Sequence, residues 1–294
     1  MQLGKKQKQR KQKQTTLIVD NCQCTEPRPF LKWAGGKRQL LDDLLQSAPK
    51  QFNDYFEPFI GGGALFFKLS IQGKITLAHL NDSNKVLMDA YRTVKEKPLE
   101  LIAELKSPKY ATDEDTFYEI RKEQPTDLVK ATARLFYLNK TAFNGLYRVN
   151  SKGLFNVPYG RYEKPKILDE ENIFAVSKAL EKDELTSLDF EQAVNCAKAK
   201  DFVYFDPPYK PLSKTSSFTS YTKEDFSEKD QQRLAKTFSE LSNRGCFVML
   251  SNSHNPWIID LYKAYNVKVV HASRMINCKA EGRGKIEEVI ITNY

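Results

Sequence analysis

The chain has 294 residues, of which 40% are hydrophobic and 12% aromatic, and its formal net charge is +9. This is enough apolar material for one large core, or for a core and a smaller inserted domain, and it argues against disorder throughout. No apolar run approaches the roughly 20 residues of a membrane span, and the N-terminus lacks a secretory signal, so we expect a cytoplasmic protein with no membrane contact. Without a CxxC pair, and with three histidines, no metal site is expected.

The positive charge is concentrated in two segments. Residues 1–19 carry six Lys or Arg and no acid, whereas residues 130–166 carry eight basic residues and one acidic residue. The first segment belongs to a Lys- and Gln-rich stretch, residues 1–28, which we expect to be a disordered arm. The second segment also carries aromatic and turn residues. A charge run is usually a solvated face, but this combination favours a surface that binds a polyanion.

Helices and strands are expected to alternate from about Pro29 onwards. The leucine spacing predicts a helix over 38–47, and further helices are expected over 63–70 and 83–95. Strands are expected at 54–59, 74–80, 201–209, 246–252, 267–273 and 286–294. This alternation predicts an α/β fold with a mostly parallel sheet covered on both faces, in which the last two strands pair antiparallel.

The middle of the chain departs from this alternation. Residues 98–142 have a helical pattern, whereas residues 143–166 contain an Asn-Gly and a Lys-Gly turn signal and three tyrosines. That composition indicates a hairpin or a looped excursion. We therefore expect residues 92–182 to form an inserted domain, between the two parts of a main domain, 29–91 and 183–294.

The segment EPFIGGGALF, residues 57–66, delivers a strand into consecutive glycines before a helix. Such a turn allows a ligand to approach the backbone closely, although the same pattern also occurs as a tight turn without a ligand. Asp82 ends the next expected strand, where an acid in a doubly wound sheet commonly binds the two hydroxyls of a ribose. A nucleoside ligand is therefore expected, and the lack of GxGxxG spacing disfavours NAD.

The motif DPPY, residues 206–209, is more specific. It follows the apolar run FVYF, so Asp206 is expected at the same edge of the sheet as the glycine turn. The Asp206 carboxylate and the Pro207 carbonyl can each accept one N–H of an exocyclic amine, which directs the nitrogen lone pair at a sulfonium methyl group. Pro207 and Pro208 keep the backbone extended, and Tyr209 offers a ring face to a base taken from the duplex.

Together these motifs resemble the Dam-like family of DNA adenine methyltransferases, with a cofactor motif first, a recognition region next and DPPY last. The resemblance covers residues 29–294. It implies a Rossmann-like methyltransferase sheet with an inserted helical and hairpin domain that recognises double-stranded DNA. It also implies transfer of a methyl group from S-adenosylmethionine to the exocyclic amine of adenine, within GATC, by base flipping and direct in-line transfer, without a metal.

The resemblance also implies a set of cofactor contacts. FLKWAGGKRQLL, residues 30–41, matches the leading motif of the family, which implies that Trp33 and Lys37 help to enclose the methionine part of the cofactor. Asp206 would be shared between the cofactor and the target base. The other implied contacts are Phe59, Gly61 and Gly63 at the border of the cofactor, Asp82 at its ribose, and Asp189 and Phe190 beside its adenine.

Residues 139–162 are similar to the recognition hairpin of the family members that read GATC. The similarity implies that Phe143, where some relatives carry tyrosine, wedges into the base stack and that Asn144 fills the space of the flipped base. Contacts to the first guanine, the outer base pairs and the backbone are implied for Lys32, Leu146, Arg148, Pro158 and Tyr162. Independently of the family, the Arg148 guanidinium can hydrogen-bond both major-groove acceptors of guanine.

Four other functions remain as alternatives. Methylation of a glutamine amide in a protein usually requires Asn before the two prolines, and it needs no basic hairpin. Methylation of the cytosine amine is chemically close, and only the hairpin resemblance argues against it. Carbon-5 methylation of cytosine requires a Pro-Cys pair, which is absent from the sequence. A DNA-binding module on an inactive methyltransferase fold is disfavoured, because all the expected catalytic residue types are present. The biological role, the oligomeric state and any protein partners are left open.

Overall fold

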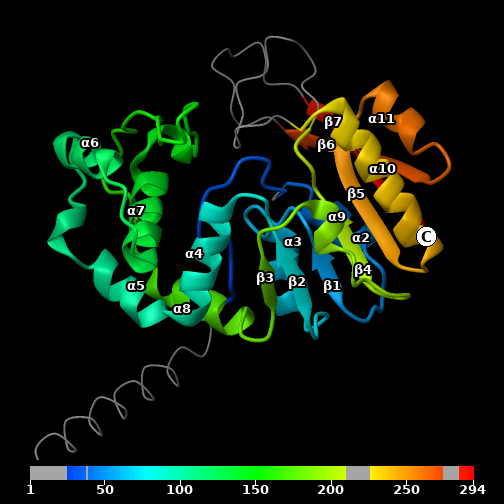
Figure 1. Cartoon of the computed structure of the whole chain (residues 1–294), viewed down its shortest axis with the longest axis horizontal. Helices are drawn as coiled ribbons and strands as arrows, with labels where there is room; N and C mark the ends of the chain where they lie inside the picture. Colours follow the sequence, from blue (N-terminus) through cyan, green and yellow to red (C-terminus); the bar gives the residue numbers. More distant parts are fainter. Residues whose placement is uncertain (1–24, 38, 210–225, 274–284) are drawn as a thin grey trace, which may run out of the picture.

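The computed structural model describes residues 25–37, 39–209, 226–273 and 285–294 (Figure 1). Within these ranges seven strands form one sheet, in the order β3-β2-β1-β4-β5-β7-β6. The strands are β1 Tyr55–Glu57, β2 Ala78–Asn81, β3 Glu184–Thr186, β4 Phe202–Phe205, β5 Phe247–Ser253, β6 Asn266–Ser273 and β7 Lys285–Thr292. The first five are parallel, and β7 runs antiparallel to both β5 and β6. The predicted fold class, including the antiparallel last hairpin, is confirmed.

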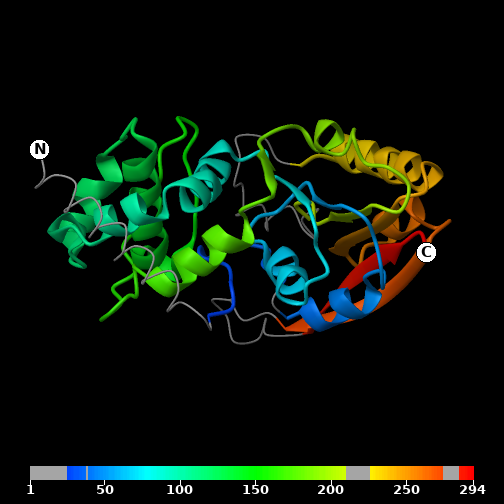
Figure 2. The same cartoon turned by 90° about the horizontal axis from the view of Figure 1, so that it is seen from below.

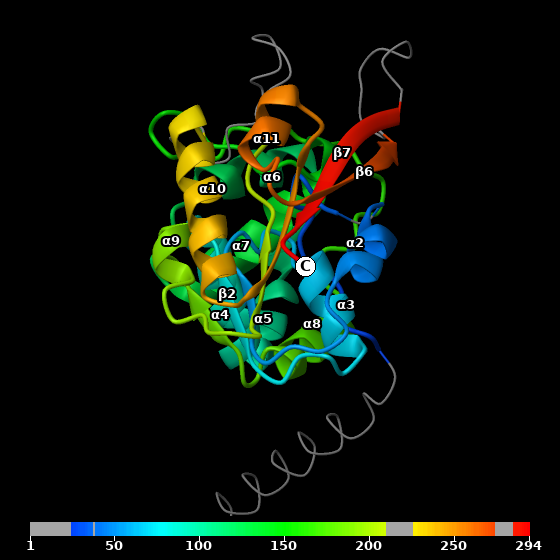
Figure 3. The same ribbon diagram turned by 90° about the vertical axis from the view of Figure 1, so that its right-hand side faces the viewer.

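Helices cover both faces of this sheet. Figures 2 and 3 show α2 and α3 on one face and α9, α10 and α11 on the other. The helices are α2 Leu41–Ser47, α3 Ala64–Ile71, α4 Lys85–Glu96, α5 Pro98–Leu105, α6 Glu114–Lys122, α7 Leu128–Thr141, α8 Glu170–Ala179, α9 Phe190–Ala193, α10 Glu228–Asn243 and α11 Pro256–Leu261. In the part of the chain that the structure describes, no helix has the length and apolar character needed to cross a membrane.

The apolar run of β4 is explained by burial on both faces of the sheet. Phe202 and Tyr204 belong to the buried cluster on the α2 and α3 side. Val203 and Phe205 belong to a second cluster, which contains Phe238 of α10. Because successive side chains of a strand point to opposite faces, a strand between two helical layers must be apolar at every position.

The helices between β2 and β3 lie beside the sheet, with α4 and α8 nearer to it than α5, α6 and α7 (Figure 1). Tyr91 of α4, Phe117 of α6 and Tyr137 of α7 belong to the same buried cluster as Phe66 of α3. Helix α4 also runs across residue 92, where the inserted domain was expected to begin. The inserted domain of residues 92–182 stays a prediction.

The last residues of the expected arm contact helix α8. The backbone N–H of Arg28 donates to Asn172 Oδ1 at 3.0 Å, and Asn172 Nδ2 donates to the Arg28 carbonyl at 3.0 Å. The Arg28 guanidinium pairs with Asp169, just before α8. These contacts differ from the disorder expected for residues 25–28, and the rest of the expected arm lies outside the described residues.

Candidate active site

The carboxyl ends of three adjacent strands bring the expected motifs together. β1 pairs in parallel with β2 on one side and with β4 on the other. The glycine turn after β1, Asp82 after β2 and Asp206 after β4 therefore leave the sheet at the same edge. In open α/β sheets this edge is where ligands bind.

Glycine is required at two positions of the turn after β1. Gly63 has a φ of +71° at the start of α3, and a Cβ there would lie 2.8 Å from the Tyr91 hydroxyl oxygen. Gly61 has a φ of +48°, and its carbonyl accepts a hydrogen bond of 3.0 Å from the Tyr91 hydroxyl. An L-residue is disfavoured in this left-handed region of φ, so the turn keeps its shape only with glycine. The hydrogen bond from Tyr91 of α4 holds the turn in place, a role that the sequence alone did not indicate.

Asp82 is tied to this turn but keeps acceptor capacity. Its Oδ2 accepts the N–H of Gly61 at 3.1 Å, and its Oδ1 accepts the N–H of Asn84 at 2.9 Å. A carboxylate offers about four acceptor positions, so further donors can be accommodated. Burial raises the pKa of Asp82 to about 6, and the hydrogen bonds from Asn84 and Gly61 oppose that rise. Asp82 is thus an anion at neutral pH with a titration within reach of mildly acidic conditions.

Glu57, at the end of β1, is a second buried carboxyl of the site. It accepts a hydrogen bond of 2.8 Å from the Tyr55 hydroxyl. Burial raises the pKa of Glu57 to about 8; the hydrogen bond from Tyr55 opposes this rise, and the charge of Asp206 adds to it. At neutral pH Glu57 is therefore mostly protonated. Its burial under the glycine turn was not predicted, although the sequence EPF shows a lone acid at the end of an apolar strand.

Asn81 joins the turn after β1 to the loop after β3. The side chain is buried, and its Nδ2 donates to the carbonyl of Pro58 at 3.0 Å and to that of Leu188 at 3.1 Å. Its Oδ1 accepts the Thr186 hydroxyl and the Leu188 N–H, both at 2.8 Å. Both polar atoms of the Asn81 side chain are engaged in these hydrogen bonds, so Asn81 has a structural role and holds the two loops together. A polar amide inside the apolar strand LAHLN was the available sign of this role.

The loop after β3 carries Asp189 and Phe190. Phe190 is buried, and its ring centroid lies 5.5 Å from that of Phe59, which places this loop beside the glycine turn. Asp189 caps α9 by accepting the N–H of Glu191 at 3.0 Å, and it pairs with Arg233 of α10 at 2.9 Å. The Arg233 guanidinium also lies 4.9 Å from the Phe190 ring centroid. The Asp189 carboxylate is therefore already engaged by α10.

Lys37 and Asp206 form an ion pair at the centre of the site. Lys37 Nζ lies 2.8 Å from Asp206 Oδ1, and it also donates to the Gly35 carbonyl at 2.8 Å. The same ammonium lies 4.5 Å from the centroid of the Tyr209 ring. Burial raises the pKa of Asp206, whereas the charge and hydrogen bond of Lys37 and the hydrogen bond of Ser251 lower it. The leading motif and DPPY, far apart in the sequence, thus meet at one carboxylate.

The DPPY loop is held from two sides. Gln231 of α10 donates to the Pro208 carbonyl at 3.1 Å, and it accepts a hydrogen bond of 3.1 Å from Asn252 of β5. The Tyr209 hydroxyl donates to Glu288 of β7 at 2.5 Å. Among the described residues, none donates to the Pro207 carbonyl. Within the described part of the chain, the carbonyl of the buried Pro207 therefore keeps its acceptor capacity, next to Asp206 in the sequence.

Sequence reasoning missed the residues that hold this loop. Gln231, Ser251 and Glu288 lie on α10, β5 and β7, and each contacts the DPPY segment through its side chain. For Ser251 a sign was available, because CFVMLSN is an apolar strand that ends in two buried polar residues. Gln231 and Glu288 lie among other polar residues and carry no comparable sign.

The leading segment is joined to the end of α7. The backbone N–H of Lys32 donates to Asn139 Oδ1 at 2.8 Å, and Asn139 Nδ2 donates to the carbonyls of Lys32 at 2.8 Å and Gly145 at 3.1 Å. The Trp33 ring stacks on Tyr147 with 5.2 Å between centroids. A Cβ on Gly61 would lie 3.1 Å from Trp33. Trp33 therefore lies between the glycine turn and the segment that follows α7.

That segment forms an irregular hairpin. Its antiparallel pairing consists of two isolated bridges, Ala142 with Tyr159 and Val149 with Phe155. Of the predicted DNA-binding side chains, Phe143 is 48% exposed, and Lys32, Asn144 and Pro158 are also exposed. Leu146, Arg148 and Tyr162 are half-buried, and Lys32 Nζ lies 5.4 Å from the centroid of the Tyr162 ring. The hairpin thus gathers the predicted side chains near the leading segment.

Arg148 is held within the hairpin by one neighbour. Its Nε donates to Asn156 Oδ1 at 2.8 Å, and its Nη2 lies 3.4 Å from the Asn156 carbonyl oxygen. The third nitrogen of the guanidinium, Nη1, has no hydrogen bond to any residue that the structure describes. Part of the guanidinium therefore remains available to an outside acceptor.

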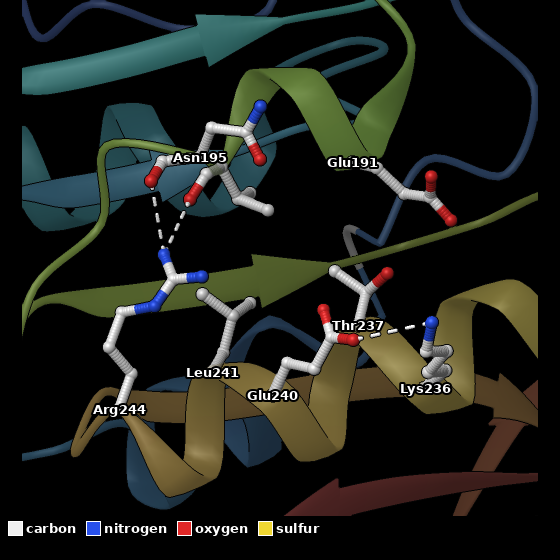
Figure 4. A pocket seen from close by; sticks show the side chains of 8 residues that line it. Glu191, Asn195, Lys236, Thr237, Glu240, Leu241 and Arg244 are labelled. Atoms are coloured by element: carbon white, nitrogen blue, oxygen red, sulfur yellow. Dashed lines mark hydrogen bonds and ion pairs between the residues drawn. The ribbon is translucent and has the colours of Figure 1, made fainter.

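A separate pocket of about 150 Å³ lies between α9 and α10 (Figure 4). On its rim Arg244 donates to the carbonyls of Val194 and Asn195, and Lys236 pairs with Glu240 at 3.6 Å. None of the predicted site residues lines it. This pocket is therefore distinct from the site at the carboxyl ends of the strands.

Comparison with known proteins identifies the class of enzyme. Residues 33–276 match the family of D12 class N6 adenine-specific DNA methyltransferases. The chain belongs to this family, which confirms the resemblance to the Dam-like enzymes. It is therefore an enzyme of a family that uses S-adenosylmethionine and methylates adenine in DNA.

Individual relatives match along almost their whole length. The chain is 47% identical to the type II methyltransferase M1.LlaDCHI of Lactococcus lactis subsp. cremoris, over 91% of this chain and 95% of the relative. It is also 47% identical to the type II methyltransferase M.MjaIII of Methanocaldococcus jannaschii, over 92% of this chain and 100% of the relative. The identity to the DNA adenine methylase of Vibrio cholerae is 34%, over 90% and 95% of the two chains.

Proposed function

We propose that this enzyme methylates adenine within GATC, after rotating the adenine out of the duplex into the site at Asp206. The observation that carries the proposal is the pair of acceptors at the start of DPPY. The Asp206 carboxylate lies at the strand edge with the glycine turn, and the Pro207 carbonyl beside it has no donor among the described residues. Two acceptors side by side match the two N–H groups of an exocyclic amine.

The chain's own residues favour methyl transfer by orienting the amine. S-adenosylmethionine, when bound, supplies a methyl group on a sulfonium, which needs an aligned nucleophile. Asp206 and Pro207 accept the two N–H hydrogens, so that the nitrogen lone pair turns away from the ring and towards the methyl group. Tyr209 fixes the plane of the base through its ring, and Pro208 keeps the loop extended. Such positioning, together with preorganised acceptors, accounts for most of the rate enhancement in this kind of reaction.

The residues at the strand edge fit S-adenosylmethionine. The turn at Gly61 and Gly63 carries no side chains, so a ligand can lie against the backbone. Asp82 retains acceptor positions for the two ribose hydroxyls, and the Lys37 ammonium provides a cation for the carboxylate of the methionine part. The aromatic residues proposed to enclose the cofactor are Trp33, Phe59 and Phe190. Asp189 is proposed to approach the cofactor adenine, which requires it to share its carboxylate with Arg233.

Base flipping is assigned to Phe143 and Asn144, at the base of the hairpin in the proposed recognition domain, next to the bridge of Ala142 with Tyr159. Phe143 is a large aromatic side chain with 48% exposure, which is costly for a free surface but suits a wedge between base pairs. Asn144 follows it with a φ of 56°, a conformation that asparagine tolerates better than most residues. We assign to Asn144 the space that the flipped base vacates.

Recognition of GATC is assigned to other side chains of the hairpin and to Lys32 of the leading segment. Arg148 is proposed to read an outer guanine through the free part of its guanidinium, and Lys32 is proposed to contact the first guanine. Leu146, Pro158 and Tyr162 are proposed to contact the outer pairs and the backbone. Their placement in one hairpin next to the leading segment supports a single footprint on the DNA.

Steady-state methylation of short duplexes tests this function. One duplex carries GATC, and matched duplexes carry a single substitution at an outer base pair. We expect fast transfer only to GATC, together with a rise in the fluorescence of 2-aminopurine placed at the target adenine, since an unstacked 2-aminopurine is brighter. Equal rates on all duplexes would contradict the assignment of GATC, and transfer without a fluorescence change would contradict base flipping.

A further inference from the structure

A chain of hydroxyl groups reaches Asp206 from inside the sheet. Ser251 of β5 donates its hydroxyl hydrogen to Asp206 Oδ1 at 2.9 Å. The Ser251 oxygen also lies 2.9 Å from the Tyr204 hydroxyl oxygen of β4. A serine hydroxyl has one hydrogen, and Ser251 gives it to Asp206, so the Tyr204 hydroxyl must donate to Ser251. The hydrogen bonds therefore run from the Tyr204 hydroxyl to the Ser251 hydroxyl and from there to Asp206.

The two side chains that donate to Asp206, among the residues that the structure describes, bind the same carboxylate oxygen. Lys37 Nζ lies 2.8 Å from Oδ1, and the Ser251 hydroxyl donates to Oδ1 as well. Among the residues that the structure describes, none donates to Oδ2. Two donors that approach Oδ1 from different elements fix the plane of the carboxylate, which a single flexible lysine would leave free to rotate. Oδ2 is consequently the oxygen that remains open.

We propose that Ser251, supported by Tyr204, is a positioning residue that fixes the Asp206 carboxylate so that Oδ2 faces the amine of the target adenine. The inference rests on the proposed role of Asp206 as an acceptor for that amine. Ser251 and Tyr204 do not touch the substrate. They act through Asp206, and linked hydroxyl donors polarise one another so that the last donor binds more strongly.

The proposal has a consequence for the titration of Asp206. A hydrogen bond donated to a carboxylate stabilises its charged form, so the bond from Ser251 holds the pKa of Asp206 below the value that it would have without that bond. The groups around Asp206 are Lys37 of the leading segment, Tyr55 and Glu57 of β1, Tyr204 of β4, Ser251 of β5, Tyr209 of the DPPY loop and Glu288 of β7. Loss of the serine hydroxyl leaves all the others in place and raises the pKa of Asp206.

The test compares Ser251→Ala with Ser251→Thr and Ser253→Ala. Ser253 is buried two residues further along β5, on the same face, and its hydroxyl does not contact Asp206. For Ser251→Ala we expect kcat on a GATC duplex to fall about tenfold or more, since a hydrogen bond to a charged group is lost. The KM values for DNA and cofactor should stay unchanged, and the acidic limb of the pH profile of kcat should move to higher pH. Ser251→Thr should restore both properties, and Ser253→Ala should match the wild type.

A second readout needs neither DNA nor cofactor. The carboxyl carbon of Asp206, labelled with ¹³C and assigned by comparison with Asp206→Asn, should titrate at higher pH in Ser251→Ala than in the wild type. Tyr204→Phe keeps Ser251 in place and removes only the outer hydroxyl, so it should move the titration in the same direction by less. An unchanged titration in both variants, or a kcat loss without any change in the pH profile, would overturn the positioning role. Full turnover in Asp206→Ala would instead overturn the proposed mechanism itself, which separates the two failures.

Discussion

At the scale of single residues, one buried and two partly buried carboxyls at one sheet edge have different pKa values because their partners differ. Glu57 accepts from the Tyr55 hydroxyl and from the Phe66 backbone, next to the charge of Asp206, and its pKa is raised to about 8, whereas Asp82 has two backbone N–H donors and a pKa raised to about 6. Burial also raises the pKa of Asp206, but the Lys37 ammonium favours the charged form of this carboxyl. Hydrogen bonds thus limit the rise in the pKa of Asp82, and the Lys37 ammonium favours the charged form of Asp206, while Glu57 is mostly neutral.

Cofactor binding should depend on the protonation of Asp82. Protonation removes the negative charge and turns one acceptor oxygen into a donor, so the affinity for S-adenosylmethionine should fall as the pH drops through about 6. Well below the pKa the loss should approach about tenfold per pH unit. Calorimetry at several pH values on both sides of 6 measures this step. The Asp82→Asn variant should bind S-adenosylmethionine weakly, and its affinity should not change at pH 6. The control is Asp89→Asn, which removes a carboxylate of α4 that pairs with Lys85 and Arg92. This control should keep the change in affinity near pH 6. A step that persists in Asp82→Asn would contradict the assignment.

The residues proposed to contact a ligand were easier to predict than the residues that hold them in place. Asp82, Asp206 and the turn glycines lie in short motifs whose chemistry is readable locally. Ser251, by contrast, lies 45 residues from Asp206 in the sequence, and Asn81 joins loops more than 100 residues apart. Such contacts depend on strand order and register, which no local pattern specifies. The same holds for Arg233, whose engagement of Asp189 was not predicted.

At the scale of secondary structure elements, strand ends position the residues proposed to act in catalysis, and the end of α7 positions the hairpin. The apolar runs that end in Asp82 and Asp206 predict β2 and β4, because strands buried on both faces must be apolar throughout. The segment after α7 was predicted as a hairpin or a looped excursion, but its detailed shape was not. Its shape comes from Asn139 and from the contact of Trp33 with Tyr147, which are tertiary contacts to the leading segment.

Within the hairpin, Arg148→Ala should change the choice of sequence. A bidentate contact to guanine discriminates by roughly 1–3 kcal/mol, so the preference for GATC over variants at one outer pair should narrow by about tenfold or more. The matched control is Lys152→Ala, which removes one positive charge from an exposed position in the turn of the same hairpin. Methylation rates on each duplex, measured at one salt concentration, distinguish a base contact of Arg148 from a phosphate contact. An equal drop on every duplex would identify a phosphate contact and exclude Arg148 from base recognition.

At the scale of the whole molecule, the positive charge is concentrated in residues 1–19 and in residues 130–166, which contain the hairpin. The hairpin segment adjoins the site, whereas residues 1–24 lie outside the described residues. Their six Lys and Arg residues are predicted to add affinity that does not depend on sequence, because each neutralised phosphate releases counterions.

Deletion of residues 1–24 should therefore weaken the salt dependence of DNA binding and leave the methylated sequence unchanged. The slope of log K against log salt should decrease by about 0.9 for each phosphate contact that is lost. A full-length variant with the six basic residues of the arm changed to Gln separates charge from length, and it should behave like the deletion. If the slope is the same in all three proteins, the arm does not contact DNA.

The central claim, adenine methylation within GATC through Asp206, is tested most directly by mapping modified bases. DNA is taken from cells that lack adenine methylation of their own and that express either the wild-type chain or Asp206→Ala at equal levels. Sequencing that detects modified bases should find N6-methyladenine at GATC on both strands with the wild type and none with the variant. N4-methylcytosine, N6-methyladenine in another sequence, or undiminished methylation by Asp206→Ala would contradict the account.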